Sequence, residues 1–168
     1  FDISIQSTLG LTDEDIEVLL TLDGVEKAEM MCDIVAKATN LKPTDFVVAS
    51  TGVIGQPINI DPIKDGMPKL VKELNKDGSN NAAEAIMTTD TVKKEIAVEF
   101  EVGGKVCKIG GIAKGSGMIH PNMATMLVFI TSDVAIAPEM LQKALSRDIQ
   151  NTFNMVSVDG DTSANSMS

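Results

Sequence analysis

Thr125 is the residue of this sequence whose type and setting could do chemistry. It follows Ala124, between the glycine-rich loop KGSG, which carries Lys114, and the apolar run MLVFI. A hydroxyl of high pKa needs a base before it can attack a carbonyl. The nearest base is the threonine's own α-amino group, whose pKa is about 7.7–8.0. That amine is free only once the Ala124–Thr125 peptide bond is cut, so the pattern predicts a nucleophile made by self-cleavage.

Other interpretations of the same stretch stay open. Threonine is a favoured strand residue, and a lysine in a glycine-rich loop is usually solvated. His120, the only histidine, has no acid or nucleophile next to it in the sequence, and we interpret it as a surface residue. We interpret Asp159 and Asp161 as loop-shaping acids, because the residues after them break the EF-hand calcium pattern.

Two more polar clusters could serve such a nucleophile. Thr51 and Gly52 follow a predicted buried strand, and glycines there permit positive φ and close approach. Backbone N–H groups in this loop could receive a developing negative charge, although an ordinary strand-to-helix turn explains the same residues. The cluster TTDT, beginning at Thr88, is typical of caps and turns, or it points hydroxyls at a ligand.

The elements that must position these residues alternate between helices and strands. Gly103 and Gly104 are typical of a hairpin turn between two strands. The alternation predicts an α/β sandwich, with helices outside and sheets within. Hydrophobic periodicity predicts helices beginning at Thr12, Val25, Asp61, Ala82 and Pro138, and strands at 46–50, 96–102 (half-buried), 105–112, 125–131 and 155–158.

Composition excludes several classes of function. The formal charge of −10 argues against a nucleic-acid surface, which needs clustered Lys and Arg. No run of 18 apolar residues exists, so we expect no membrane span. Cys32 and Cys107 have no metal-ligand spacing, and reduced thiols suit a cytoplasmic protein. We therefore expect no nucleic-acid partner, no membrane partner and no metal site.

Three stretches in this order resemble the bifunctional ornithine acetyltransferase / glutamate N-acetyltransferase family. They are ASTGVIGQP at 49–57, KGSGMIHPNMATML at 114–127 and VDGDTSAN at 158–165. The resemblance implies a layered αββα-type sandwich with mixed sheets, an N-terminal-nucleophile-like (ornithine acetyltransferase / DmpA-like) fold. It also implies that 1–124 is part of an α-chain segment and 125–168 the start of a β-chain segment, in one incomplete structural domain.

The resemblance assigns roles residue by residue. Members transfer an acetyl group from N-acetylornithine to glutamate by a ping-pong route in arginine biosynthesis, after autoproteolysis at the site matched by Ala124–Thr125. Thr125 matches the nucleophile, and Thr51 with Gly52 matches the oxyanion hole. Thr88 and Lys114 match substrate-binding residues, together with Thr125.

The family uses no metal or organic cofactor, because the acetyl group is carried on the protein; some members also take acetyl-CoA as donor. We expect N-acetylornithine and glutamate as substrates, an α/β heteromer after cleavage and a higher oligomer. Two alternatives stay open. One is a related N-terminal-nucleophile aminopeptidase or amidohydrolase. The other is an inactive truncated domain acting in assembly, because the sequence ends where a family member would supply a substrate-binding glutamate.

Overall fold

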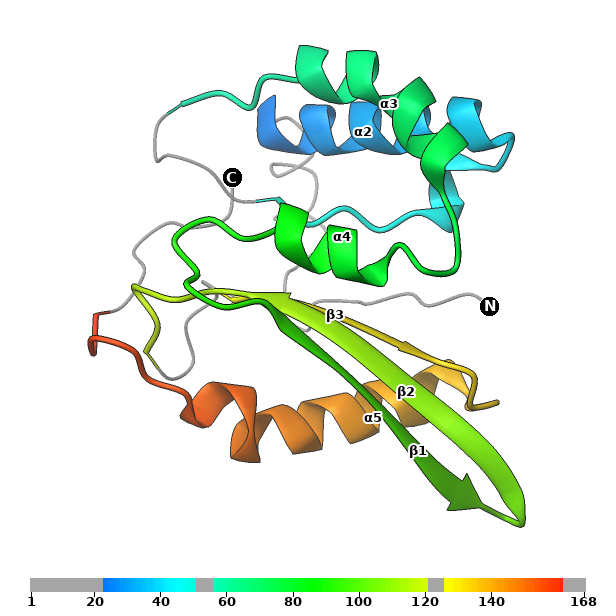
Figure 1. The fold of residues 1–168 in the computed structure, drawn as a ribbon, viewed down its shortest axis with the longest axis vertical. Coiled ribbons are helices and arrows are strands. Elements are labelled where there is room, and N and C mark those ends of the chain that lie inside the picture. Colours follow the sequence, from blue (N-terminus) through cyan, green and yellow to red (C-terminus); the bar gives the residue numbers. More distant parts are fainter. Residues whose placement is uncertain (1–22, 51–55, 121–125, 162–168) are drawn as a thin grey trace, which may run out of the picture. The chain divides into compact units, whose positions relative to one another are not determined.

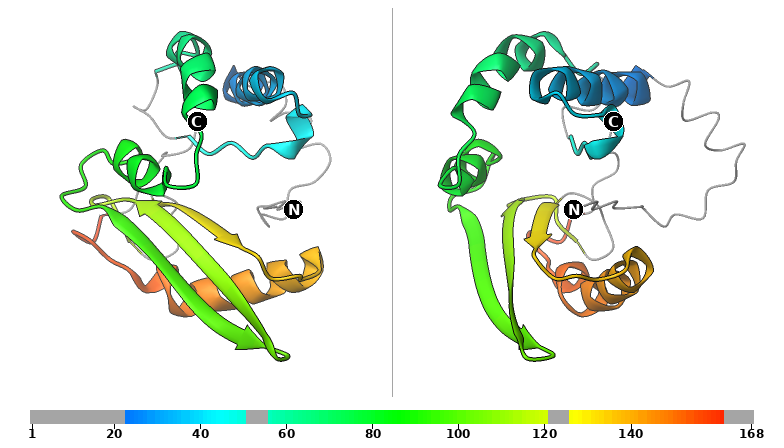
Figure 2. Two further views of the ribbon diagram at one scale, coloured as in Figure 1. Left: turned by 45° about the vertical axis from the view of Figure 1, so that its right-hand side comes forward. Right: turned by 90° about the vertical axis from the view of Figure 1, so that its right-hand side faces the viewer.

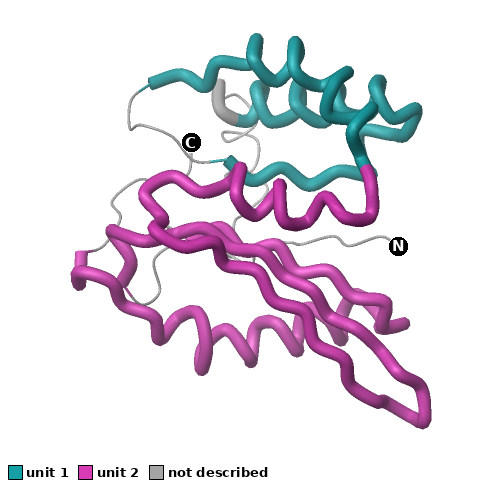
Figure 3. Tube along the Cα trace, viewed as in Figure 1, with its two compact units in different colours: residues 1–74, 165–168 teal, residues 75–164 magenta. Residues whose placement is uncertain are grey.

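The computed structural model describes residues 23–50, 56–120 and 126–161. The chain divides into two compact units, one of residues 1–74 with 165–168 and one of residues 75–164 (Figure 3). The predicted cleavage boundary between 124 and 125 falls inside the second unit, and the division into two cleavage segments stays a prediction. Along the described ranges, no helix is both long and apolar enough to cross a membrane.

The first unit is a helix pair. Helices α2 (Asp23–Thr39) and α3 (Asp61–Glu73) contact each other (Figure 1) and confirm the two helices predicted there. Ala36 of α2 and Ile60, which precedes α3, are among its few buried residues. The helix α3 continues through its internal proline, Pro68. The spacing of the apolar residues therefore predicts the extent of α3 better than the internal proline does.

The strand predicted at 46–50 is wrong. The short 3-10 helix η1 (Pro43–Asp45) is followed by Phe46, which is extended at φ −118° and ψ 143°, but the segment pairs with no strand that the structure describes. A strand needs a neighbour to receive its backbone hydrogen bonds. Every described strand belongs to the second unit, so the described part of the first unit offers this segment no partner strand.

The second unit is built on an antiparallel sheet of three strands, in the order β1–β2–β3. Figure 2 shows the strands twisting together, with helix α5 along one side of the sheet. The unit confirms the predicted α/β class, although this one described sheet is antiparallel. Its elements are α4 (Ser79–Ala85), β1 (Lys94–Val102), β2 (Lys105–Lys114), β3 (Leu127–Ser132) and α5 (Pro138–Asp148).

The hairpin of β1 and β2 is the best-predicted part of the fold. Gly103 and Gly104 turn the chain at φ +58° and +74°, as a tight hairpin turn requires. The strands are confirmed, but the predicted half-burial of the β1 apolar face holds only at Phe100, which is half-buried. The exposed side chains of this face are Ile96 at 69%, Val98 at 49% and Val102 at 55%.

Two further boundaries differ from the prediction. The helix expected at 82–87 begins three residues earlier and ends at Ala85, where Met87 N donates to Glu84 O and tightens the last turn. The strand expected at 155–158 is wrong. The 3-10 helices η2 (Ile149–Asn151) and η3 (Phe153–Met155) end at its first residue, and only an isolated bridge with Ile119 follows at Val158 and Asp159.

Candidate active site

Lys114 lies at the end of β2, where the sheet delivers the chain into the glycine-rich loop. It is 7% exposed, although it carries a charge. Its strand position pairs with Leu127, the first residue of β3 and two positions after Thr125 in the sequence. Among the described residues, no hydrogen bond or ion pair reaches its ammonium. A lysine ammonium at the start of this loop suits an anionic group such as a carboxylate.

Gly115 makes the turn out of the strand, and only glycine fits there. Its φ is +146°, a conformation that L side chains rarely adopt. A Cβ at this position would lie 3.0 Å from Ile119 Cδ1 and 3.4 Å from Met126 Cα. The loop is therefore closely packed immediately after Lys114, which limits the positions open to the lysine backbone.

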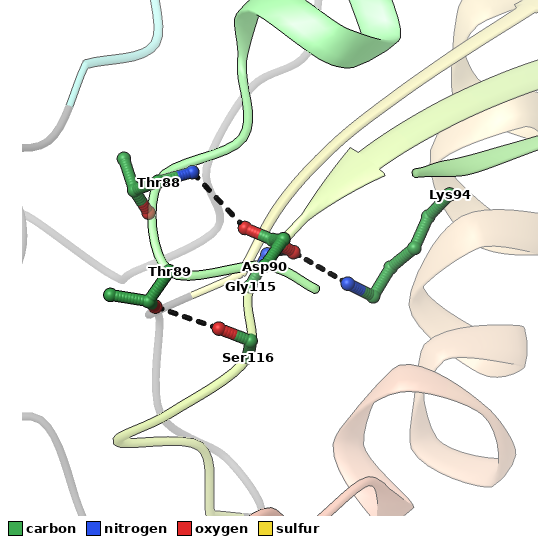
Figure 4. A network of polar contacts seen from close by, with 6 residues as sticks. All are labelled: Thr88, Thr89, Asp90, Lys94, Gly115 and Ser116. Carbon is green, nitrogen blue, oxygen red and sulfur yellow. Dashed lines mark hydrogen bonds and ion pairs between the residues drawn. The ribbon is translucent and has the colours of Figure 1, made fainter. Parts of the chain in front are cut away.

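The carboxylate of Asp90 lies inside this packing, with its side chain fully buried. Its Oδ1 accepts hydrogen bonds from Gly115 N at 2.9 Å and Lys94 Nζ at 2.5 Å, and its Oδ2 accepts one from Thr88 N at 3.3 Å (Figure 4). Burial alone would raise the pKa of Asp90. The donors and the charge of Lys94 outweigh that effect and lower the pKa to about 2, so the group is a permanent anion at neutral pH.

The threonine turn lies directly beside the glycine loop. Thr89 Oγ1 and Ser116 Oγ are 2.7 Å apart and share a hydrogen bond (Figure 4). Thr88 and Thr89 are both exposed, so their hydroxyls are accessible to a small molecule. The backbone N–H of Thr88 and that of Gly115, the residue after Lys114, thus donate to the same carboxylate, that of Asp90.

The far end of the loop is held by a second carboxylate. Met118 N donates to Asp159 Oδ2 at 2.8 Å, and Val158 N donates to Ile119 O at 2.8 Å. The hydrogen bond from Met118 is the largest cause of a lowered pKa at Asp159, which is exposed. The interpretation of Asp159 as a loop-shaping acid is therefore confirmed. His120, just beyond, is exposed as expected.

Four predicted site residues lie outside the described residues: Thr51, Gly52, Ala124 and Thr125. The predictions of a nucleophile, a cleavage site and an oxyanion hole therefore stay predictions. Among the described ranges, no group of three His, Cys, Asp or Glu side chains could hold a metal ion.

Asp90 is the residue that the sequence reasoning missed. The cluster TTDT was interpreted for its hydroxyls, as caps or ligand contacts, and the acid within it was given no role. One signal was available, since Asp90 and Lys94 stand four positions apart as an acid and a base. Nothing in the sequence alone shows that Gly115, 25 positions away, donates to the same carboxylate.

The comparisons with known proteins agree on one family. The model of the ArgJ family matches residues 18–168. The arginine biosynthesis bifunctional protein ArgJ 1 of Nostoc is 51% identical over 142 residues, 84% of this chain and 34% of that protein. The glutamate N-acetyltransferase of Methanocaldococcus jannaschii is 55% identical over 150 residues, 86% of this chain and 37% of that protein.

A solved structure extends the likeness to the fold. The crystal structure of the arginine biosynthesis bifunctional protein ArgJ from Bacillus halodurans matches with a TM-score of 0.53 and 37% sequence identity. The match covers 64% of this chain and 55% of that one. The chain spans 34% to 37% of the length of the two curated relatives above, so much of their length has no counterpart in it.

Proposed function

Because the chain belongs to the ArgJ family, we propose that the protein transfers an acetyl group from N-acetylornithine to glutamate, through an acetyl ester on Thr125. Two relatives support this reaction by name, one as a bifunctional protein of arginine biosynthesis and one as a glutamate N-acetyltransferase. The observation that carries the proposal furthest is the position of Lys114, which is buried at the end of β2 and paired in register with Leu127. Its ammonium would pair with a carboxylate of either amino-acid substrate.

The reaction begins with the making of the nucleophile. Thr125 Oγ attacks the carbonyl of Ala124, the peptide C–N bond breaks, and the hydroxyl proton passes to the released amine. Water then cleaves the resulting ester, which leaves a carboxylate on Ala124 and a free α-amine on Thr125. That amine serves as the base for the neighbouring hydroxyl in the next step.

Acetyl transfer then follows in two halves. The Thr125 hydroxyl attacks the acetyl carbonyl of N-acetylornithine and ornithine leaves; the amine of glutamate then attacks the acetyl ester and regenerates the hydroxyl. The backbone N–H groups at Thr51 and Gly52 stabilise the oxyanion in each half. Lys114 binds a substrate carboxylate, and the exposed hydroxyl of Thr88 contacts the substrate. The acetyl group needs no metal or organic carrier, and acetyl-CoA is an alternative donor.

The proposal extends to the whole protein around this chain. Cleavage before Thr125 leaves an α and a β segment that stay together as a heteromer, in a layered αββα sandwich of higher oligomeric state, located in the cytoplasm. Three exposed apolar side chains of β1 support the proposal that another layer of the whole protein packs against this strand. They are Ile96, Val98 and Val102.

Mass spectrometry of the expressed chain tests the first step. We expect two fragments divided before Thr125, and a single intact mass from the Thr125→Ala variant. Thr131→Ala is the matched control, since this exposed threonine of β3 lies six positions further along. An intact wild-type chain after prolonged incubation, or a cleaved Thr125→Ala variant, would contradict the proposed nucleophile.

Product analysis separates the transferase from a hydrolase. With N-acetylornithine as donor, we expect N-acetylglutamate to form only when glutamate is present, and ornithine release to depend on glutamate. Equal rates of ornithine release with and without glutamate would identify water as the acceptor. That result would favour the related N-terminal-nucleophile hydrolase.

A further inference from the structure

The buried carboxylate of Asp90 is bound by donors from three separate segments of the chain. Thr88 N comes from the turn after α4, Lys94 Nζ from the start of β1, and Gly115 N from the loop after β2. The side chain of Asp90 has no exposed surface, whereas that of Lys94 is 36% exposed. The carboxylate therefore faces the packed interior, and the ion pair closes it off on the outer side.

The hydrogen bond from Gly115 bears directly on Lys114. The Gly115 N–H belongs to the peptide unit that also contains the Lys114 carbonyl, and a peptide unit is planar. Fixing that N–H at 2.9 Å from Oδ1 fixes the orientation of the whole unit. Pairing with Leu127 in β3 holds the same residue as part of the sheet. Lys114 is thus constrained on its β3 side and at its following peptide.

The turn that carries Thr88 is tied to the same anchor. Asp90 accepts from Thr88 N within the turn, and Thr89 shares a hydrogen bond with Ser116 across to the loop. From this geometry we propose that Asp90 is a positioning residue. Its carboxylate holds the Lys114–Gly115 peptide and the Thr88–Thr89 turn as one rigid unit, and so sets where the Lys114 ammonium meets its anion.

Chemistry at the acetyl group is not the role of Asp90. A carboxylate with a pKa of about 2 and donors on both oxygens is a poor proton acceptor at neutral pH. Asp90 affects the reaction by positioning Lys114, because a side chain that is held in place before the substrate arrives binds it more tightly. The expected effect on KM rests on the proposed function. The expected effect on the position of Lys114 does not depend on it.

The kinetic test is the Asp90→Asn variant. One amide keeps a single acceptor oxygen and cannot serve Gly115, Thr88 and Lys94 together. If Lys114 binds the substrate carboxylate before the chemical step, its misplacement raises KM for N-acetylornithine by about tenfold or more, with little change in kcat. A role in stability alone would lower the amount of active protein and leave KM unchanged, and that outcome would overturn the proposal.

A chemical test needs no acetyl transfer. Reductive methylation with formaldehyde, followed by peptide mass spectrometry, measures how accessible each lysine amine is. We expect Lys114 to react slowly in the wild type, because it is buried, and about tenfold faster in Asp90→Asn, because the charged hydrogen bond that holds the Lys114–Gly115 peptide in place is lost. The exposed Lys105 and Lys143 serve as internal references, and Asp159→Asn, at the far end of the loop, should leave the Lys114 rate unchanged.

The two tests fail in distinguishable ways. A wild type without acetyl transfer but with the expected change at Lys114 would contradict the proposed function and support the positioning role. An unchanged Lys114 rate in folded Asp90→Asn would overturn the positioning role whatever the activity. If that variant does not fold, amide exchange in the wild type decides, since Gly115 N–H must exchange as slowly as the amides within β2, and fast exchange overturns the proposal.

Discussion

Two carboxylates accept backbone hydrogen bonds from the loop Gly115–Ile119, one near each end, but they differ in burial and charge pairing. At its start, Asp90 is buried and neutralised by Lys94; at its end, Asp159 is exposed and accepts Met118 N without an ion-pair partner among the described residues. Both pKa values are lowered, that of Asp90 to about 2. A carboxylate that accepts a backbone hydrogen bond can therefore shape the loop whether it is exposed or buried. At the buried site water cannot replace the carboxylate, so Asp90 should also contribute more to stability.

The largest effect should come from removing the buried anchor. Asp90→Ala leaves Lys94 and two backbone N–H groups without their acceptor, and we expect a loss of about 3 kcal/mol in the free energy of unfolding. Urea unfolding measures it. Asp159→Ala is the matched control and should destabilise less, because water replaces the carboxylate at an exposed site. Equal losses in the two variants would remove the distinction between the ends of the loop.

Adding a methyl group at Gly115, the first residue of the loop, and at Gly117, in its middle, is the next sharpest comparison. Gly115→Ala should cost about 2–3 kcal/mol, from a positive φ together with crowding against Ile119. Gly117→Ala should change stability by less than about 1 kcal/mol, because its Cβ would only meet Asp159 Oδ2 at an ordinary 3.5 Å. Thermal unfolding of both variants tests this, and a well-tolerated Gly115→Ala would contradict the close packing.

Acid should weaken the buried anchor in a defined window. A folded pKa of about 2, against an ordinary 3.8, means that the charged form of Asp90 stabilises the fold above about pH 4. This contribution, about 2 kcal/mol, is lost as the pH falls toward 2. Urea titrations across this range should show a smaller loss for Asp90→Asn than for the wild type. A variant with the wild-type pH dependence would show that other acids account for the loss.

The smallest expected effect lies at the exposed link between turn and loop. Thr89→Val removes the hydrogen bond to Ser116 and should cost less than about 1 kcal/mol. Thr91→Val is the matched control, since this exposed threonine of the same cluster makes no hydrogen bond with a described residue. Unfolding of both variants under identical conditions measures the difference. A loss as large as that of Asp90→Ala would place the anchor at the hydroxyl pair instead.

Local sequence patterns predicted an element well where the residues of that element alone determine its structure. The glycine pair at 103–104 produces the hairpin, and apolar periodicity with Pro138 produces α5. The failures share another cause. Whether residues 46–50 and 155–158 become strands depends on a partner strand, which periodicity within the segment does not reveal.

The site was predictable in part, for the same reason. Lys114 and Thr88 were identified through motif resemblance, and the structure ties Thr88 and the peptide that follows Lys114 to Asp90. Asp90 was missed because its role depends on a contact with Gly115, across the length of the β1–β2 hairpin. A buried acid that serves backbone groups from distant segments has no short sequence signature.

The strand β1 also has a consequence for handling the protein. It forms one edge of the described sheet, where another copy could add a strand through backbone hydrogen bonds, and its apolar side chains Ile96, Val98 and Val102 are exposed to water. The formal charge of −10 keeps copies apart at low ionic strength. Salt shortens the range of that repulsion to about 10 Å at 0.1 M. Concentrated solutions should therefore turn cloudy as salt is raised, and a lysine on this strand edge should restore their clarity.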